Sequence, residues 1–485
     1  MAAALATALI DASLAFGRSI ALTGAGLSLT YESLLAQASR VGEALAAAGL
    51  RRDEPVHVLA SNHPHDVVAL FGVWLAGGVV VPVHRTTPAP VAAGTRARTG
   101  ARFQLDGPAL TWMAGEPPPM RPLLAGAAFI VFTSGSTGEP KGVVVAHDAF
   151  RGKLRQIDSL LRFGPTDRTS LILNLTFSFG LWLSLLTLIR GGTLAMHEKF
   201  ESQAFCNQLI DDRITRVGMV PTMMRVLFSD PASAADIDRV TAAGDLAQIS
   251  IGGESLGRSL ADTIRSRFAA TRLIDIYGLT ETATCDFFAF PDDYAKYPGC
   301  IGRPSPNVAF RIVDRDDRVV DSGAVGELQI ATPYVMAGYL DAPALTAAAF
   351  SDGWFRTGDL ARCVADDVVA LMGRKKEVIS RGGNKVTPVE IEQSLCTHPD
   401  VAAAMAVGID DPLLGQRIHV LLVPRPGARL AEASVRAFLH GTLERYKHPD
   451  RYYAADALPT GRTGKADRTL LRSLIEDGLV TRLPA

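Results

Sequence analysis

Apolar segments of two kinds alternate through the first 370 residues of the chain. Residues 32–50 carry apolar side chains at helical spacing and stop at Gly49, whereas 55–60 (PVHVLA) has the length and composition of a strand. A second helix-like and strand-like pair follows at 65–78 and 79–83. This alternation predicts mostly parallel sheets covered by helices. Further strands are predicted at 216–221, 248–254, 272–278 and 326–331.

A change in composition near residue 371 predicts a second, smaller domain. The chain of 485 residues is too long for one ordinary core. Residues 373–385 are strongly basic, and a small α+β unit is expected after them. We therefore predict an N-terminal domain over 1–372 and a C-terminal domain over 373–485. Residues 84–126 are rich in proline and glycine and are interpreted as an irregular connection.

The overall composition excludes several classes of partner and compartment. The net charge of −1 argues against a nucleic-acid or anionic-membrane surface as the main partner. Five scattered cysteines without a C-x-x-C pair indicate neither a disulfide framework nor a zinc site. The apolar N-terminus lacks the basic region of a signal peptide, and Asp11 interrupts it. We expect a cytoplasmic protein.

One charge-free stretch, residues 171–189, is long enough to span a bilayer. Polar side chains recur through it, and no second such span accompanies it. We favour a buried strand, turn and helix, with a membrane anchor as the alternative reading.

A hydroxyl- and glycine-rich loop follows a strand-like segment at 129–142 (FIVFTSGSTGEPKG). Glycines let backbone N–H groups approach an anion closely, and Lys141 supplies a point charge for a phosphoryl group. The segment is not an ordinary P-loop, because Pro140 precedes the lysine and Gly142 replaces the residue that would hold Mg²⁺. Taken alone, it indicates either a phosphate site or a plain surface loop.

Six separated segments resemble the signatures of the adenylate-forming enzymes, in that family's order. They are the loop just described, 277–282 (YGLTET), 326–339, 353–361 (GWFRTGDLA), 373–392 and 458–468 (LPTGRTGKADR), with weaker matches at 29–34 and 75–83. The family includes acyl-CoA and aryl-CoA synthetases, peptide-synthetase adenylation domains and luciferases, and the chain is most similar to the acid–CoA ligases. The resemblance covers nearly the whole chain, although 84–126 looks shorter than usual, which we expect to trim a peripheral element.

The resemblance implies a fold and a two-step reaction. The fold is α/β: a large N-terminal domain of parallel or mixed sheets covered by helices, with a small barrel-like subdomain, and a small mobile α+β C-terminal domain. In the reaction, a carboxylic acid attacks the α-phosphate of ATP to give an acyl-adenylate and pyrophosphate, and a thiol then displaces AMP. ATP, Mg²⁺ and coenzyme A are implied, without a nucleic acid or a membrane span. Monomer and homodimer both remain open.

The resemblance also assigns an ATP site. The glycine-rich loop would hold the β- and γ-phosphates, Gly252, Gly253 and Glu254 would form a wall on the adenine side, and Tyr277 and Gly278 would meet adenine. Asp359 would accept hydrogen bonds from the ribose hydroxyls, with Arg374 beside the ribose or the phosphates. Tyr277 could instead be an ordinary buried tyrosine, and 252–254 a plain turn. The loop residues are Thr133, Ser134, Gly135, Ser136, Thr137, Gly138 and Lys141.

Three residues are carried over as catalytic and one as a hinge. Thr280 would hydrogen-bond the α-phosphate, and Glu281 would hold Mg²⁺, although an acidic residue there could merely cap a helix. Lys465 would bridge the attacking carboxylate and the α-phosphate, since a cation between two anions stabilises their meeting in the transition state. Lys376 matches the hinge position. Either lysine could instead be an ordinary surface residue.

The acid pocket is expected around 174–186, 219–224, 252–254 and 279–287. The position that carries an aspartate in amino-acid-activating members falls on Ser178 or on Gly180, depending on the alignment, and neither is anionic. A buried ammonium group without a partner would be costly, so an amino-acid substrate is disfavoured. Aromatic and medium-chain acids remain, and aromatic side chains at 177, 179 and 182 could line a flat slot or be core packing. The predicted pocket residues are Phe177, Ser178, Trp182, Met219, Gly253, Gly278 and Thr284.

Coenzyme A is the expected thiol, because 380–388 (SRGGNKVTP) resembles the CoA-ligase form of that loop. Gly382 and Gly383 could line a pantetheine tunnel. The basic residues of this region could contact the nucleotide phosphates of CoA or form a solvated basic face; they are Arg381, Lys385, Arg445 and Lys447. The phosphopantetheine of a carrier protein is the alternative acceptor. A catalytically silent ATP-binding relative is a further alternative, against which the presence of Glu281, Asp359 and Lys465 argues.

Overall fold

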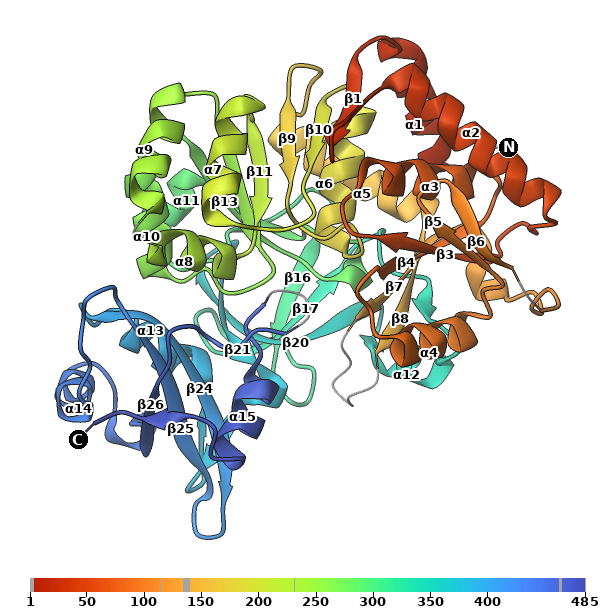
Figure 1. Ribbon diagram of the computed structural model, residues 1–485. Coiled ribbons are helices and arrows are strands. Elements are labelled where there is room, and N and C mark those ends of the chain that lie inside the picture. Colours follow the sequence, from red (N-terminus) through yellow and green to blue (C-terminus); the bar gives the residue numbers. More distant parts are fainter. Residues whose placement is uncertain (1–3, 114, 134–139, 231, 462–464, 485) are drawn as a thin grey trace.

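The structure is a computed structural model that describes residues 4–113, 115–133, 140–230, 232–461 and 465–484. Figure 1 shows a large N-terminal region, coloured red to cyan, and a smaller blue C-terminal region beside it. The two regions meet around the strands β20 (Trp354–Ala365) and β21 (Val368–Arg374).

The first large sheet has nine strands and a parallel centre. Its order is β15 (Arg303–Pro304), β14 (Phe287–Ala289), β13 (Arg272–Tyr277), β12 (Gln248–Gly252), β11 (Arg216–Met219), β9 (Arg168–Leu171), β10 (Thr193–Met196), β1 (Ile20–Gly24) and β2 (Leu27–Thr30). All pairs from β13 to β1 are parallel, and β14, β15 and β2 are antiparallel additions. The carboxyl ends of β12 and β13 therefore lie at one edge, where open parallel sheets commonly bind ligands.

The second large sheet has seven strands and carries the glycine-rich segment. Its order is β18 (Gly338–Tyr339), β8 (Lys141–Ala146), β7 (Ala127–Thr133), β4 (Val79–His84), β3 (Pro55–Ala60), β5 (Phe103–Asp106) and β6 (Ala109–Met113). One core cluster joins both sheets through buried apolar side chains of α1 (Ala4–Phe16), α2 (Tyr31–Ala47), α3 (Pro64–Leu75), α5 (His147–Leu161) and α6 (Ser178–Ile189).

Other helices cover the outer side of the nine-stranded sheet with a second core cluster. They are α7 (Ser202–Asp211), α8 (Pro221–Ser229), α9 (Ser233–Ala243), α10 (Arg258–Arg267) and α11 (Pro291–Lys296). Together the two clusters bury both faces of the parallel strands, as the near-continuous apolar runs of those strands require.

A small antiparallel sheet follows and leads into the C-terminal domain. It contains β16 (Ala309–Val313), β17 (Gly326–Ala331), β20, β19 (Phe350–Ser351) and β21, with its own buried core, and α12 (Pro343–Ala348) precedes β19. The boundary predicted after residue 372 falls inside β21, which continues to Arg374. A short 3₁₀ turn, Lys375–Glu377, then connects the strand to the last domain.

The C-terminal domain is the α+β unit that the sequence predicts. Its sheet contains β22 (Ile379–Arg381), β23 (Asn384–Val386), β24 (Val401–Asp411), β25 (Gly415–Pro424), β26 (Arg451–Ala454) and β27 (Thr481–Arg482). Its helices are α13 (Pro388–Leu395), α14 (Glu432–His440) and α15 (Arg468–Glu476). A separate core cluster of its own buried side chains supports it.

Most predicted elements are confirmed, and one interpretation is wrong in part. Strands β3 and β17 have the predicted bounds, and 171–189 is the end of β9, a connection and the buried helix α6. The segment 84–126 is only partly irregular, since it contains α4 (Ala89–Thr99), β5 and β6, whereas residues 115–121 form neither helix nor strand. Pro88 and Pro90 lie at the start of α4, where proline is tolerated, and Gly100 ends the helix with φ +65°.

Across the described ranges, no helix is both long enough and apolar enough to cross a membrane. The membrane-anchor reading of 171–189 therefore lacks a spanning helix, because α6 has only 12 residues.

Candidate active site

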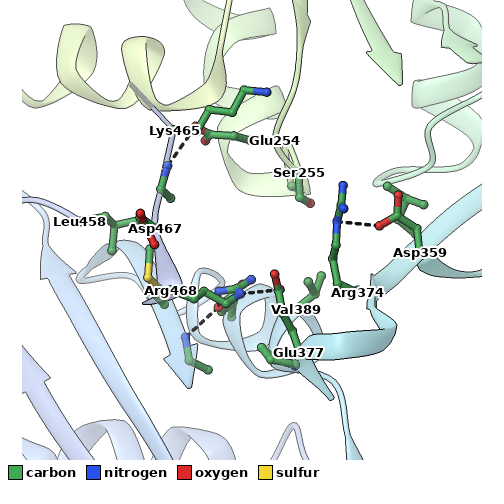
Figure 2. Close-up of a pocket in the computed structure, with 18 of the residues that line it drawn as sticks. Glu254, Ser255, Asp359, Arg374, Glu377, Val389, Leu458, Lys465, Asp467 and Arg468 are labelled. Atoms are coloured by element: carbon green, nitrogen blue, oxygen red, sulfur yellow. Dashed lines mark hydrogen bonds and ion pairs between the residues drawn. The ribbon is translucent and has the colours of Figure 1, made fainter. Parts of the chain in front are cut away.

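A cleft of about 830 Å³ lies between the two domains. Its N-terminal side is formed where β12 and β13 end, at Gly253, Tyr277 and Gly278, together with Asp359 of β20. Its C-terminal side includes Lys376 and Lys465. Figure 2 shows Arg374 reaching Asp359 on one side of the cavity, with Lys465 and Glu254 on another. The cleft thus brings together residues from four of the six motifs, whereas no described residue of 129–142 or 326–339 is among those that line it.

Asp359 is a buried carboxylate of the cleft that two side chains hold in place. Its side chain is only 5% exposed. The Tyr277 hydroxyl donates to Oδ2 at 2.6 Å, and Arg374 Nε lies 2.8 Å from Oδ1. Burial raises the pKa of Asp359, and Arg374 and the Tyr277 hydroxyl oppose that rise. A carboxylate has about four lone-pair directions, so Asp359 can still accept further hydrogen bonds.

The Tyr277 ring is positioned by these contacts and by Phe287. The two ring centroids are 6.0 Å apart in an edge-on arrangement. Burial raises the pKa of Tyr277 well above its usual value, and the neighbouring Asp359 adds to the rise. Tyr277 therefore remains a neutral hydrogen-bond donor at the wall of the cleft. Its predicted contact with adenine stays a prediction.

Lys465 reaches from the C-terminal domain across the backbone of Gly253. A Cβ atom added to Gly253 would lie 2.9 Å from both Cε and Nζ of Lys465. Gly253 also has φ +84°, which favours glycine. Burial lowers the pKa of Lys465, and Arg374 adds to this, whereas Glu254 raises it. A poorly solvated cation therefore stands over the end of β12.

Glu254 anchors the segment that carries Lys465. The backbone N–H of Ala466 donates to Glu254 Oε1 at 3.2 Å. The Thr222 hydroxyl lies 2.9 Å from each oxygen of the same carboxylate, and Arg225 Nη1 is 3.3 Å from Oε2. This inter-domain contact is a role of Glu254 that the sequence did not predict. The predicted position of Glu254 beside adenine stays a prediction.

Glu281 and Lys141 meet around one tyrosine ring. The Tyr339 hydroxyl donates to Glu281 Oε1 at 3.0 Å, and Lys141 Nζ lies 5.2 Å from the centroid of the Tyr339 ring. The hydroxyl of Thr280 donates to that of Ser178 at 3.3 Å. A cation, a carboxylate and two hydroxyls thus gather where the first strand of the glycine-rich segment, β7, ends. Thr133 is the last residue of β7, and Ser134, Gly135, Ser136, Thr137 and Gly138 lie outside the described residues.

The loop that carries Thr280 and Glu281 has an uncommon backbone. Ala283, Thr284 and Cys285 have φ values of 56°, 74° and 52° in succession. A left-handed conformation costs a non-glycine residue roughly 1–2 kcal/mol. Below the loop, Lys153 of α5 forms an ion pair with Asp286 at 2.8 Å, and neither side chain has exposed surface. No sequence motif indicates this pair.

The predicted acid-pocket residues fall into two groups. Ser178 and Phe177 are half-buried at the start of α6, near Thr280. Trp182 and Met219 have no exposed surface and belong to the two core clusters, so neither can contact a bound acid in this conformation. Thr284 is 7% exposed. The prediction for Trp182 and Met219 is therefore not supported by their burial.

Phe179 is the aromatic residue that separates this core from the strand ends. Its ring stacks on Trp182 with centroids 5.4 Å apart. Added Cβ atoms at Gly218 and Gly252 would lie 3.1 Å and 3.4 Å from the Phe179 ring. An added Cβ at Gly180 would lie 2.4 Å from the Asn174 carbonyl oxygen, so that glycine is required by packing. Of the two aligned positions, only Ser178 has room for a side chain directed at a substrate.

The predicted hinge residue lines the same cleft as Lys465, whereas the predicted CoA-facing residues do not line it. Lys376 lines the cleft within the 3₁₀ turn. Gly382 and Gly383 form the two-residue turn between β22 and β23, where φ values of 55° and 83° suit glycine. Arg381 Nη2 is 2.6 Å from Asp450 Oδ1, and the Lys385 ammonium group donates to the Ser380 hydroxyl. None of residues 381–385 is among the residues that line the cleft.

Comparison with known proteins agrees with this geometry. Residues 11–111 and 108–340 match the family described as AMP-binding enzyme, and residues 390–465 match the AMP-binding enzyme C-terminal domain. The chain belongs to the AMP-binding enzyme family. The two matched regions lie on either side of the 3₁₀ turn at Lys375–Glu377.

Several relatives are similar over nearly their whole length. A sulfoacetate–CoA ligase of Cupriavidus necator is 33% identical, with 92% of each chain covered. A feruloyl-CoA synthase of an Amycolatopsis species is 30% identical over 91% of this chain and 92% of that one. A fatty acid–[acyl-carrier-protein] ligase of Streptomyces coeruleorubidus is 32% identical, again with 92% of each chain covered.

Among solved structures, ATP-bound MatB from Rhodopseudomonas palustris superposes with a TM-score of 0.86 at 25% identity. The match covers 98% of this chain and 99% of that one. Family and relatives together identify the chain as an ATP-dependent, AMP-forming acid–thiol ligase of the acyl-CoA synthetase type.

Proposed function

We propose that this enzyme activates a non-amino carboxylic acid, aromatic or of medium chain length, and transfers the acyl group to coenzyme A. The observation that carries the proposal is the position of Lys465 over Gly253, in the same cleft as Tyr277 and Asp359. The C-terminal domain thus brings this lysine into the same cleft as Tyr277 and Asp359 of the N-terminal domain. That arrangement suits the first step, in which an acid meets ATP.

In adenylation, Lys465 bridges the attacking carboxylate and the α-phosphate. Burial lowers the pKa of this lysine, so the cleft solvates its charge poorly. Two anions brought together at its ammonium group supply the missing stabilisation, which is greatest in the transition state. Thr280 donates a hydrogen bond to the α-phosphate, Asp359 accepts those of the ribose hydroxyls, and Tyr277 offers its ring to adenine.

The β- and γ-phosphates are proposed to lie between Lys141 and Glu281. Mg²⁺ prefers oxygen ligands and is usually held by one or two carboxylates together with substrate phosphates. The described residues include no group of three or more His, Cys, Asp or Glu that could hold a metal without a substrate. Glu281, with Oε1 accepting from Tyr339, fits a metal that arrives with ATP. Bound there, Mg²⁺ would neutralise the charge of the leaving pyrophosphate.

In thioester formation, the C-terminal domain is proposed to rotate about Lys376. The turn with Gly382 and Gly383 would then replace Lys465 in the cleft and admit the pantetheine arm. Arg381 and Lys385 would meet the CoA phosphates after leaving the partners they have in this conformation. A phosphopantetheine carried by a protein is the alternative acceptor, and a relative at 32% identity carries such a name.

The proposed acid has an uncharged body. Ser178 faces Thr280 and offers a hydroxyl, not an anion, so a substrate ammonium group would lack a partner. Phe179 supplies an apolar ring close to Gly252 at the end of β12. The named relatives act on sulfoacetate, ferulate and fatty acids at 30–33% identity, and so they do not choose among these classes.

A panel of acids in a pyrophosphate-release assay, with and without CoA, tests the proposal. We expect turnover of benzoate-type acids, of 3-phenylpropanoate or of hexanoate to decanoate, and thioester formation when CoA is added. Phenylalanine is the matched control, because it is 3-phenylpropanoate with an ammonium group. If phenylalanine or sulfoacetate were turned over in preference to these acids, the substrate proposal would be wrong. Binding of ATP without pyrophosphate release for any acid would indicate a catalytically silent relative.

The place of action is proposed to be the cytoplasm. All five cysteines are free thiols in the structure, as expected in a reducing compartment.

A further inference from the structure

A charged pair with no exposed surface lies beneath the loop that carries Thr280 and Glu281. Lys153 Nζ and Asp286 Oδ1 are 2.8 Å apart, and the Thr282 hydroxyl donates to the other oxygen of Asp286. Burying two charges is costly, and an ion pair often recovers little of that cost. Stability alone is therefore a weak explanation for this pair.

The backbone directly before Asp286 has an unfavourable conformation that the ion pair could hold in place. Residues 283–285 all have positive φ, and none is glycine. L residues visit this region singly, because Cβ crowds the carbonyl oxygen there. A run of three persists only if the surrounding structure holds both of its ends.

Asp286 is where the end of this left-handed turn is tied down. Its N–H donates to the Tyr277 carbonyl oxygen at 2.7 Å, which closes the loop onto the end of β13. Its own carbonyl accepts from Ser305 N–H at 2.7 Å. A Cβ on Gly278 would lie 2.2 Å from the nitrogen of Cys285, so the turn folds directly against the start of the loop.

Lys153 contacts both segments that surround Glu281. Besides its bond to Asp286, its Nζ lies 5.8 Å from the centroid of the Tyr334 ring. Tyr334 belongs to the segment whose Met336 N–H donates to the Glu281 carbonyl at 2.7 Å and whose Tyr339 holds the Glu281 carboxylate. One ammonium group thus sits at the junction of the two segments.

We propose that the Lys153–Asp286 pair positions Thr280 and Glu281, by holding the left-handed turn 283–285 closed beneath them. Neither member of the pair touches the substrates, so both are positioning residues. The inference rests on the proposed role of Glu281 in holding the metal that accompanies ATP.

The test measures ATP binding to the full-length enzyme by calorimetry, once with saturating Mg²⁺ and once with EDTA, and so does not require the acid to be known. We expect Asp286→Asn and Lys153→Met to raise the Kd for ATP with Mg²⁺ by ~10-fold or more, as for other residues that orient metal ligands. The Kd in EDTA should change by a clearly smaller factor, because without Mg²⁺ only the Thr280 contact to the α-phosphate is disturbed and the other nucleotide contacts are intact.

Glu54→Gln is the matched control. Glu54 is 4% exposed and pairs with Arg102 at 2.6 Å, far along the chain from the loop. It should lower the melting temperature and leave the ratio of the two Kd values unchanged. If a single variant fails to fold, Lys153→Met with Asp286→Asn removes both charges together. Equal changes of both Kd values in these variants, or a lower melting temperature alone, would overturn the proposal.

A second variant tests the turn itself. Ala283→Gly removes the crowding at one left-handed position, so in the Asp286→Asn background it should restore part of the Mg²⁺-dependent ATP affinity. No recovery would argue against the turn as the link. Glu281→Gln tests the proposed role of Glu281 separately from that of the Lys153–Asp286 pair. If this variant leaves the Mg²⁺ dependence of ATP binding unchanged, the proposed role of Glu281 is wrong, whatever the variants of the pair show.

Discussion

The two halves of the cleft are held in different ways. On the N-terminal side, Asp359 and Tyr277 lie on β20 and β13 within hydrogen-bonded sheets, and buried contacts fix both side chains. On the C-terminal side, Lys465 lies outside the helices and strands, and its segment is tied to the N-terminal domain through the hydrogen bond from Ala466 N–H to the Glu254 carboxylate. The rigid half is suited to binding ATP. The lightly held half, which carries Lys465, is suited to leaving the cleft so that another segment of the C-terminal domain can replace it.

Two segments of the C-terminal domain also differ in where they lie relative to the cleft. Lys465 lies in the cleft, whereas the β22–β23 turn does not line it, and Arg381 is paired with Asp450. Elsewhere across the domain boundary, Arg425 Nη2 donates to the Ser259 hydroxyl at 3.4 Å, a long contact. A domain held by such contacts can leave at modest cost, which is what a two-step reaction at one site needs.

The largest expected effect comes from removing the cation of the lightly held half. Lys465→Ala should reduce acyl-adenylate formation by ~10²–10³ or more, as when one oxyanion-stabilising group is lost. It should spare thioester formation from supplied acyl-adenylate, because the second step does not use this lysine. The two half-reactions are measured separately, by pyrophosphate release and by thioester yield. A parallel fall in both would show that the lysine serves both steps.

The second largest effect is expected from a substitution in the turn that connects the two halves. Lys376→Pro fixes φ near −65° and removes an N–H in the 3₁₀ turn. We expect adenylation to survive and thioester formation to fall by ~10², the cost of misplacing reacting groups. Lys376→Ala, which keeps the backbone free, is the control and should affect neither step strongly. Equal loss in both steps, or in neither, would place the hinge elsewhere.

Sequence patterns located the residues of the cleft better than the contacts that support them. The family resemblance placed Gly253, Asp359 and Lys465 in one site, and all three line the cleft. Residues 84–126 were partly misread because proline and glycine mark the ends of α4 as readily as they mark a loop.

Contacts between distant parts of the chain were not predictable in this way. Lys153 and Asp286 are 133 positions apart, and Ala466 and Glu254 are 212 apart. In a single sequence, a buried lysine in an amphipathic helix looks like a solvated one. The positive φ values at 283–285 also carry no sequence signal, since none of the three residues is glycine.

The smallest expected effect concerns the anchor between the two halves. Glu254→Gln keeps an oxygen that can accept from Ala466 N–H but removes the charge opposite Lys465 and Arg225. A charge-assisted hydrogen bond is worth ~1 kcal/mol more than a neutral one, so adenylation should fall by ~5-fold while thioester formation from supplied adenylate is unchanged.

The pH dependence of adenylation gives a second test of Glu254. Lys465 must be protonated to act, so adenylation declines as pH rises through its pKa, which burial lowers and Glu254 raises. Removing Glu254 should therefore move this alkaline decline to lower pH. Glu390→Gln is the matched control, because Glu390 pairs with Lys447 and does not line the cleft. An unshifted profile in Glu254→Gln, with the same loss in both half-reactions, would mean that Glu254 supports the fold and not the placement of Lys465.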